Sequence, residues 1–501
     1  MGYATGKSRY QMKILCFDDY VAKDSTARII DEFINGLDME ALGFKYAVPK
    51  HLGRNPYDPA CLAKLLVYGY EYGVRSSRKL EALTHKDIEA IWLMDELMPD
   101  FKTIANFRRD NLVPLERLLE EYNALAEFGE MFGKERVAID GTKIKASNNK
   151  KNNYSKNKLI RNIEHSNQRI KEYMSLLEET DDMDDACEAA EKIEKYGVRI
   201  EKAQKRLDRL DETGENEIST VDPDARLMGN NHSGVDVGYN VQAAVDGKAH
   251  LVAAFDITQN PTDHGQLGNM TEKTQEILRK KGITVLADKG YYGGDDIEEA
   301  EKLGAKLVVA RQLKPGEKGG SRFSLDKFVY DKEKDEYICP EGEVLLAHSK
   351  STTKNRTFFN KDACKACPAR GECLNKEKFR RIVRGPKNDA LDRADKRYAE
   401  NKEEYKYRQQ IVEHVFGTVK RTMNGGYFLL RTKKKVRTEA ALLFLGYNIK
   451  LTKGFLGFER TMELLSEWQA FQRDRMPFVF YFIKHVFAFW PAVQIFATKP
   501  A

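Results

Sequence analysis

The chain is poor in tryptophan and cysteine, and its charges nearly cancel. It has three Trp and seven Cys in 501 residues, and 83 Lys and Arg stand against 77 Asp and Glu. Seven cysteines, four of them crowded between positions 339 and 373, are not the disulfide framework of a small secreted protein, so we expect a reducing cytoplasm. The formal net charge of +6 is a weak argument for a nucleic-acid partner, which must depend on local basic clusters instead.

Long hydrophobic runs are scarce as well. The first ten residues, MGYATGKSRY, contain no apolar stretch of the kind found in a secretory signal. The segment 476–498 is long enough to span a bilayer, but Lys484 and His485 lie at its middle and a proline interrupts it. We therefore predict a buried or interfacial helix there and no membrane partner, with a membrane span as the alternative.

The apolar residues that are present suffice for at least one large core. They make up 41% of the chain, and the length suggests about three domains. Two heptad-patterned arms on either side of the acidic turn ETDDMDD predict an antiparallel helical hairpin. Beyond it, Asp246-Gly247 separates two strand patterns, and a β-α-β-α-β succession follows up to Arg311. The sequence therefore predicts a mixed α/β fold, with helices flanking a mixed sheet.

Two short aliphatic runs each lead into an aspartate and a glycine. The segment Val137–Ala146 reads VAIDGTKIKA and contains Asp140, and ITVLADKGYYG contains Asp288. Both runs predict buried strands that end at the acid. A buried carboxylate is costly without a cation, so each acid needs a basic side chain or a metal ion. If the two strands are neighbours, both carboxylates emerge at the same edge of one sheet.

Glu413, in YKYRQQIVEHVFGTVKR, is a third acid that could join them. Its apolar neighbours predict that it lies beside a buried stripe and not on an open solvated face. Three convergent carboxylates cannot all ionise without cations, and two Mg²⁺ or Mn²⁺ ions would satisfy them. Such a pair of ions suits in-line attack on a phosphodiester. Taken singly, any of these acids could equally be a cap, a turn or a surface charge. That is our interpretation of five others, Asp222, Asp236, Asp246, Asp256 and Asp263.

The first part of the chain predicts several short helices. Asp58-Pro59 begins one, a second begins in the cluster from Arg75 to Lys79 and continues past Ile88, and FKTIANFRRDN begins another with Thr103 as its cap. Basic and hydroxyl residues near helix N-termini suit phosphate contacts. The residues that we select for DNA contact here are Arg75, Arg78 and Arg108, the last in a pair that we expect to be exposed. An ordinary helical domain with solvated charges is the alternative.

Four cysteines form a separate pattern. Cys339 lies in CPEGE, and Cys364, Cys367 and Cys373 lie in CKACPARGEC. A C-x-x-C with two further cysteines is typical of a closed tetrahedral zinc site in a small loop-rich insert. Free thiols in a reducing cytoplasm are the alternative.

Three motifs in this order resemble the bacterial insertion-sequence transposases of the DDE type. They are VAIDGTKIKA around Asp140, LADKGYYGGDDI around Asp288, and IVEHVFGTVKR, which contains Glu413 and Lys420. GVRSSRKLEAL resembles the amino-terminal domain of the same transposases, and the resemblance spans most of residues 55–450. It implies a ribonuclease H-like core with a Tyr-Arg-Glu-Lys signature on its last helix.

The resemblance also implies roles for these residues. Asp140, Asp288 and Glu413 would bind the two catalytic metal ions. The resemblance and the nearby basic clusters point to DNA contacts at Lys420, Arg408, Tyr405 and Lys143. The family has its arginine four residues before the glutamate, where this chain has Gln409, so Arg408 is one residue early. A one-residue shift turns a helical side chain by roughly 100°, and the tyrosine is displaced in the same way.

We divide the chain accordingly and predict its function. A helical DNA-binding domain takes residues 1–130, the catalytic domain 131–450 and a helical tail 451–501, with a hairpin insert at 150–220 and a cysteine-bearing insert at 312–388. The predicted function is cleavage at terminal inverted repeats and strand transfer on double-stranded DNA, by a transient dimer in the bacterial cytoplasm at the nucleoid. The alternatives are a metal-dependent nuclease without strand transfer and a catalytically silent DNA-binding descendant.

Overall fold

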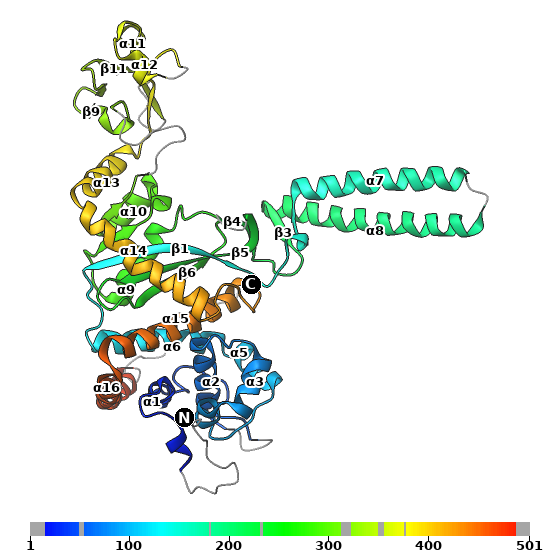
Figure 1. Ribbon diagram of the computed structural model, residues 1–501, viewed down its shortest axis with the longest axis vertical. Helices are drawn as coiled ribbons and strands as arrows, with labels where there is room; N and C mark the ends of the chain where they lie inside the picture. The colour runs from blue at the N-terminus through cyan, green and yellow to red at the C-terminus, as the bar shows by residue number, and fades with distance from the viewer. Residues whose placement is uncertain are drawn as a thin grey trace, which may run out of the picture.

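A six-stranded mixed sheet forms the centre of the molecule (Figure 1). The computed structural model describes residues 16–49, 55–179, 182–230, 234–311, 322–348, 355–374 and 377–486. The strand order is β4 (Arg226–Asn230), β5 (Gly234–Asp246), β1 (Arg136–Lys145), β7 (Thr284–Ala287) and β8 (Lys306–Val309), with β6 (Val252–Thr258) also paired to β5. β1 is antiparallel to β5 and parallel to β7, and β7 is parallel to β8. The predicted mixed α/β fold is confirmed.

The sheet forms where the sequence alternates aliphatic runs with turn and helix signals. Asp246 ends β5, and the chain returns as β6 in the predicted hairpin. The predicted β-α-β-α-β succession is β6, α9 (Leu267–Leu278), β7, α10 (Gly294–Lys302) and β8. The aliphatic residues of β7 and β8 are almost wholly excluded from solvent, as expected for parallel strands that helices cover.

One hydrophobic core joins the sheet to the N-terminal helices. The helix α15 (Lys433–Leu456) is buried along most of its length and contacts α6 (Leu112–Phe128), α2 (Pro59–Glu71) and β6. Other helices on the same side of the sheet as α15 are η1 (Phe17–Tyr20), α1 (Thr26–Asn35), α3 (Ser77–Lys86), α4 (Ile88–Leu93), α5 (Phe101–Asp110) and α16 (Phe458–Val486). The core is therefore continuous across residue 130 and across residue 450.

The N-terminal helices differ from the prediction at two caps. Asp58 and Pro59 begin α2 as predicted. The second predicted helix is two helices, because Asp87 ends α3 and its side chain accepts a hydrogen bond from Ala90 N to begin α4. The cap of α5 is Asp100, whose Oδ1 accepts from Thr103 N at 2.7 Å, so the prediction of Thr103 as cap was wrong.

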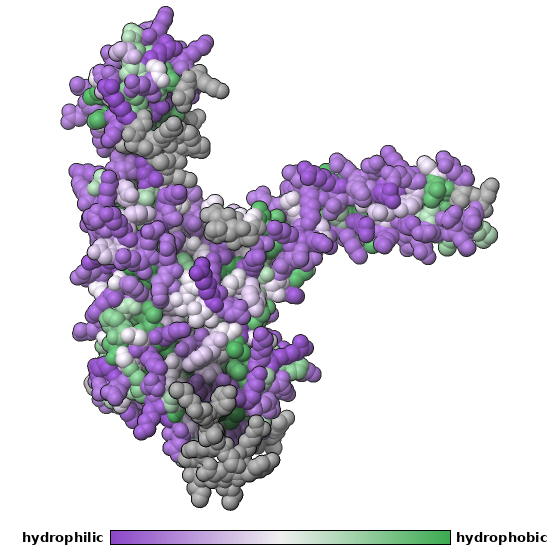
Figure 2. All heavy atoms as spheres, in the orientation of Figure 1, coloured by the Kyte–Doolittle hydropathy of each residue, from purple (hydrophilic) through white to green (hydrophobic). Residues whose placement is uncertain are grey.

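The predicted antiparallel hairpin projects from the sheet as α7 (Lys156–Glu179) and α8 (Met183–Thr213) (Figure 1). Its base carries η2 (Lys150–Asn152) and the two-stranded pair β2 (Asn153–Ser155) and β3 (Glu217–Ser219). Leu159, Ala203 and Leu210 of the heptad seam pack against each other within the hairpin. The visible surface of the hairpin is mostly hydrophilic (Figure 2), so its seam is used internally.

The cysteine-bearing insert has its own five-stranded antiparallel sheet. The order is β13 (Ile382–Arg384), β12 (Arg356–Phe359), β11 (Val344–Ala347), β10 (Glu336–Ile338) and β9 (Val329–Asp331). The short helices η4 (Leu325–Lys327), α11 (Lys361–Ala366) and α12 (Arg370–Cys373) complete it. These strands were not predicted, because at three or four residues each they are too short to show a clear period between the loops of the insert.

Three helical elements return the chain from this insert to the sheet. They are α13 (Asn388–Glu400), α14 (Lys402–Gly417) and the π-helical turn η5 (Thr418–Thr422), while η3 (Lys289–Tyr291) follows β7. In α16 the chain is helical to Val486, and the rest of the 476–498 segment lies outside the described residues. Within the described part of the chain, no helix combines the length and the apolar character needed to cross a bilayer.

Candidate active site

The two aspartates lie side by side at one edge of the central sheet. Ile139 of β1 is the register partner of Ala287 in β7, and Asp140 and Asp288 are the next residues on these parallel strands. β7 ends at Ala287, and the Asp288 side chain does not cap the turn η3 that follows. β1 instead continues to Lys145 along β5. The prediction that Asp140 ends its strand was therefore wrong, although the parallel ladder does end there.

The Asp140 carboxylate is largely buried beside one cation. Its side chain is 20% exposed, and its Oδ2 lies 3.3 Å from Nη1 of Arg408. Burial raises the pKa of Asp140 to about 6, while Arg408 and a hydrogen bond from Gly141 N lower it and the nearby Asp288 and Asp263 raise it. Because the pKa of Asp140 is raised overall, one guanidinium does not fully offset the cost of charging this carboxylate.

Arg408 reaches Asp140 in spite of its displaced position in the signature. The residue is 8% exposed on the face of α14 that packs on the sheet. Its guanidinium lies 5.7 Å from the centre of the Tyr405 ring, so both displaced residues are in the site. An irregular turn between Arg408 and Glu413 could have offset the one-residue shift. The π-helical turn η5 comes only after Glu413, so Arg408 reaches the acid from a regular stretch of helix.

Lys420 enters the site from η5. Its Nζ donates to Thr142 Oγ1 at 2.5 Å, and Thr142 lies two residues after Asp140 on the same face of β1. Burial lowers the pKa of Lys420, and the nearby Asp140 raises it. This side chain is thus an ammonium donor held next to the buried acid.

Glu413 is not in contact with either aspartate. It is exposed, so the prediction that it avoids an open solvated face was wrong. It lies on α14 between Arg408 and Lys420, whose side chains contact Asp140 and Thr142. Among the described residues, no three His, Cys, Asp or Glu side chains are close enough to form a ready metal site. The helix that carries Glu413 therefore crosses the site, but its carboxylate faces solvent.

A further carboxylate, Asp263, lies in the same region. Its Oδ1 accepts hydrogen bonds of 2.8 Å from Asn240 Nδ2 and from Gln242 Nε2. Gly141 and Gly290 give it room, because a Cβ at Gly141 would collide with Asp263 Oδ1 and one at Gly290 would lie 3.2 Å from Oδ2. Our interpretation of Asp263 as a cap, a turn or a surface charge missed this placement.

A sequence signal for Asp263 does exist on β5. Asn240 and Gln242 are amides at alternate positions of the buried part of β5, and both are fully buried. Buried amides require polar partners, so they predict a polar group that packs on that face of the sheet. The Tyr291 hydroxyl donates to Gln242 Oε1, while Asn240 Oδ1 has no hydrogen-bond partner among the described residues.

Two parts of the chain match known protein families. The family described as "Transposase DDE domain" matches residues 338–452, and the one described as "Transposase domain (DUF772)" matches residues 15–110. Both matched families are transposase families, and together they indicate an insertion-sequence DDE transposase. The first match contains Arg408, Glu413 and Lys420, and the two aspartates lie outside both matches. No curated protein and no solved structure matches the chain.

Two of the arginines selected as DNA contacts are buried in this transposase. Arg75 is 2% exposed and its Nη1 lies 2.8 Å from Glu439 Oε1, and a second nitrogen donates to Asn424 O. Arg108 is 6% exposed and donates to Tyr70 Oη and to Arg75 O. The prediction that Arg108 is exposed was wrong, because both guanidiniums have partners inside the protein. Arg75 connects the N-terminal helices to the chain around α15, whereas Arg108 joins segments of the N-terminal helices to each other.

Replacing Arg75 by Ala should destabilise the protein. The change leaves Glu439 buried without its cation, and breaking a buried pair in this way costs about 3–5 kcal/mol of unfolding free energy. Arg78, which is exposed and stacks on the Phe101 ring, is the matched control. Thermal unfolding of Arg75→Ala and Arg78→Ala measures the difference. Equal unfolding temperatures would contradict a structural role for Arg75.

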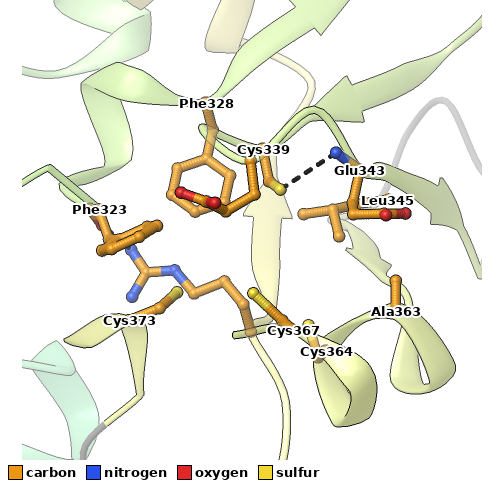
Figure 3. Close-up of a pocket in the computed structure, with 11 residues that line it drawn as sticks. Phe323, Phe328, Cys339, Glu343, Leu345, Ala363, Cys364, Cys367 and Cys373 are labelled. Atoms are coloured by element: carbon orange, nitrogen blue, oxygen red, sulfur yellow. Dashed lines mark hydrogen bonds between the residues drawn. The ribbon is translucent and has the colours of Figure 1, made fainter. Parts of the chain in front are cut away.

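Arg78 and Lys143 are the selected cations that remain available on the surface of the transposase. Arg78 is exposed near the start of α3, and Lys143 is half-buried on β1 beyond Asp140. Lys145 and Lys150, in contrast, both pair with Asp236. The four cysteines lie far from this sheet, around one small cavity of the five-stranded insert (Figures 1 and 3).

Proposed function

We propose that the protein cuts DNA at the terminal inverted repeats of its mobile element and joins the freed ends to target DNA. The placement of Asp140 and Asp288 as neighbours on parallel strands carries this proposal. Glu413 is the third ligand, on the helix that crosses these strands. In this assignment the three carboxylates hold two Mg²⁺ or Mn²⁺ ions.

The donor set fits such ions. Carboxylate oxygens are the ligands that Mg²⁺ and Mn²⁺ prefer, and Asp140 is a buried acid that one arginine only partly neutralises. When bound, the ions would activate the attacking oxygen and stabilise the leaving oxygen of the phosphodiester. Arg408 must leave Asp140 Oδ2 for that oxygen to become a ligand. Glu413 must turn from solvent toward the sheet.

The remaining residues of the site hold the DNA. Lys420 is half-buried near Asp140 and would neutralise a non-bridging oxygen of the scissile phosphate, while Thr142 fixes the direction of its ammonium group. Arg408, once released, would contact the same strand and stay stacked on Tyr405. The exposed Arg78 and Lys143 would contact the phosphate backbone further along, with an affinity that falls steeply with salt.

We also propose that the central sheet is a ribonuclease H-like core. The antiparallel run β6-β5-β1 continues as the parallel run β1-β7-β8, and the acids follow the paired ends of β1 and β7. The hairpin α7–α8 and the five-stranded unit are then inserts between its elements. The first 130 residues would recognise the inverted repeats, and holding two element ends together would require a dimer at the bacterial nucleoid.

Strand transfer with pre-cleaved element ends tests the proposal. The DNA that flanks the gene should contain imperfect inverted repeats and supplies these ends. We expect joined products in Mg²⁺ from wild-type protein. Cleavage of uncut ends without any joining would instead identify a metal-dependent nuclease on the same core. Binding with neither reaction would identify a catalytically silent descendant.

Asp263→Asn should weaken the reaction without unfolding the protein. Asparagine keeps an acceptor for Asn240 and Gln242 but removes a negative charge near Asp140. Changes to groups that support metal ligands reduce metal affinity or activity by about 10–100-fold, so cleavage should need more Mg²⁺. A Mg²⁺ titration of cleavage measures this. Asp295→Asn, at a side chain that is 91% exposed, is the control. An unchanged Mg²⁺ requirement would make Asp263 purely structural.

A further inference from the structure

Four cysteines from two segments of the five-stranded unit surround one small cavity. Cys339 follows β10, whereas Cys364, Cys367 and Cys373 lie on or next to α11 and α12. All four line a cavity of about 30 Å³ (Figure 3). None of them is in a disulfide. A cavity of this size holds a single ion or water and excludes an organic ligand.

The backbone around Cys339 forms a tight turn that also donates a hydrogen bond to its sulfur. Cys339 N donates to Glu343 O at 2.9 Å and Gly342 N to Cys339 O at 2.8 Å, so the chain turns tightly after β10. Gly342 supplies the left-handed conformation of that turn, with φ +83°. Glu343 N then donates to Cys339 Sγ at 3.3 Å, the dashed line in Figure 3. A backbone N–H that points at a ligand sulfur holds it in a fixed orientation, as the outer contacts of metal ligands do.

The second segment brings three thiols to the opposite side of the cavity. Asn360 caps α11, which places Cys364 on the helix and Cys367 at its end. Cys373 ends α12. In Figure 3 these three sulfurs lie across the cavity from Cys339. Burial, and the nearness of the three other thiols, raise the pKa of Cys373, whereas Arg380 lowers it.

This unit has a small core for its size. Its buried hydrophobic cluster consists of five residues, Phe328, Tyr337, Leu345, Phe358 and Ile382, and Cys339 and Cys373 pack against it. The core is separate from the one that joins the sheet to the N-terminal helices. Small units of this kind usually need a disulfide or a metal ion to be stable. The cysteines are therefore placed where a cross-link would add most to the stability of the unit.

We propose that Cys339, Cys364, Cys367 and Cys373 bind one structural Zn²⁺ as a tetrathiolate. The site goes beyond the proposed function, because it is separate from the sheet that carries the aspartates. The described sulfurs do not yet form a ligand set, and rotation about the Cα–Cβ bonds would close them on an ion in the cavity they share. Binding releases the thiol protons to solvent. Arg380, which also lines the cavity, would offset the negative charge of the complex.

Metal analysis of the full-length protein tests the proposal. Protein purified without chelator in reducing buffer should contain one zinc per chain, and cobalt exchanged into it should give the absorption spectrum of a tetrahedral tetrathiolate. A thiol reagent should release the zinc from the wild-type protein as the four cysteines react. This test does not depend on whether a cysteine variant folds. Cys339→Ser and Cys373→Ser should each lose most of the zinc. Cys187→Ser, at an exposed position on α8, should retain it.

Three results would overturn the proposal. They are a zinc-free protein that takes up neither zinc nor cobalt, unchanged zinc in a Cys339→Ser/Cys373→Ser double variant, and disulfides among the four cysteines under reducing conditions. None of these readouts depends on transposition, so the zinc site and the proposed function fail or succeed separately.

Discussion

Asp140→Asn is expected to reduce DNA cleavage by a factor of about 10³ or more. The metal ions of such a site supply several kcal/mol of transition-state stabilisation, and each 1.36 kcal/mol corresponds to a factor of ten. Asparagine has nearly the same shape, and its Oδ1 can still accept from Gly141 N. The fold and DNA binding should therefore persist, so the loss should appear in the rate of cleavage and not in affinity.

The comparison needs an aspartate of similar chemistry outside the site. Asp211 on the hairpin helix α8 is exposed and pairs only with Lys156 among the described residues. Asp211→Asn should cleave at the wild-type rate. Cleavage rates in Mg²⁺ and in Mn²⁺, with DNA binding measured in parallel, give the result. Wild-type cleavage by Asp140→Asn would remove this residue from the catalytic centre.

Glu413→Gln should abolish cleavage and leave the stability of the protein unchanged. The side chain is exposed and makes no hydrogen bond with other described residues, so the substitution removes no contact that holds the fold. Loss of cleavage at unchanged stability is the result expected for a metal ligand that has no structural role. Glu403→Gln on the same helix is the matched control, because its carboxylate is 84% exposed and pairs with Lys406.

The readouts for Glu413→Gln are the unfolding temperature, DNA affinity and cleavage rate of the two variants. Cleavage lost only in Glu413→Gln, at unchanged stability and affinity, supports its role as third ligand. Retained cleavage would remove Glu413 from the triad. Asp263, the further carboxylate near Asp140, would then be the next residue to test for that role.

Local sequence patterns were sufficient for the sheet and for its two aspartates. β1 contains an aliphatic run before Asp140 and β7 is an aliphatic run before Asp288, and an acid in either place is costly to bury, so the pattern and the chemistry agreed. The hairpin α7–α8 was also predictable, because its heptad seam is a local signal.

Pairings between distant segments were not predictable. Arg75 looked like a surface cation in a basic cluster, but its partner Glu439 is 364 residues away and buried inside α15. Arg408 is one residue early in the signature, which on a regular helix rotates its side chain by roughly 100° from the direction that the family's arginine has. The direction of a helical side chain also depends on how the whole helix packs, and α14 packs with Arg408 on the sheet.

Anomalous diffraction from crystals of the protein with an element-end DNA and Mn²⁺ tests the central claim most directly. We predict two manganese peaks beside Asp140, Asp288 and Glu413, with Arg408 displaced from Asp140. The claim would be contradicted if manganese bound elsewhere and Arg408 still paired with Asp140 when the scissile phosphate is bound.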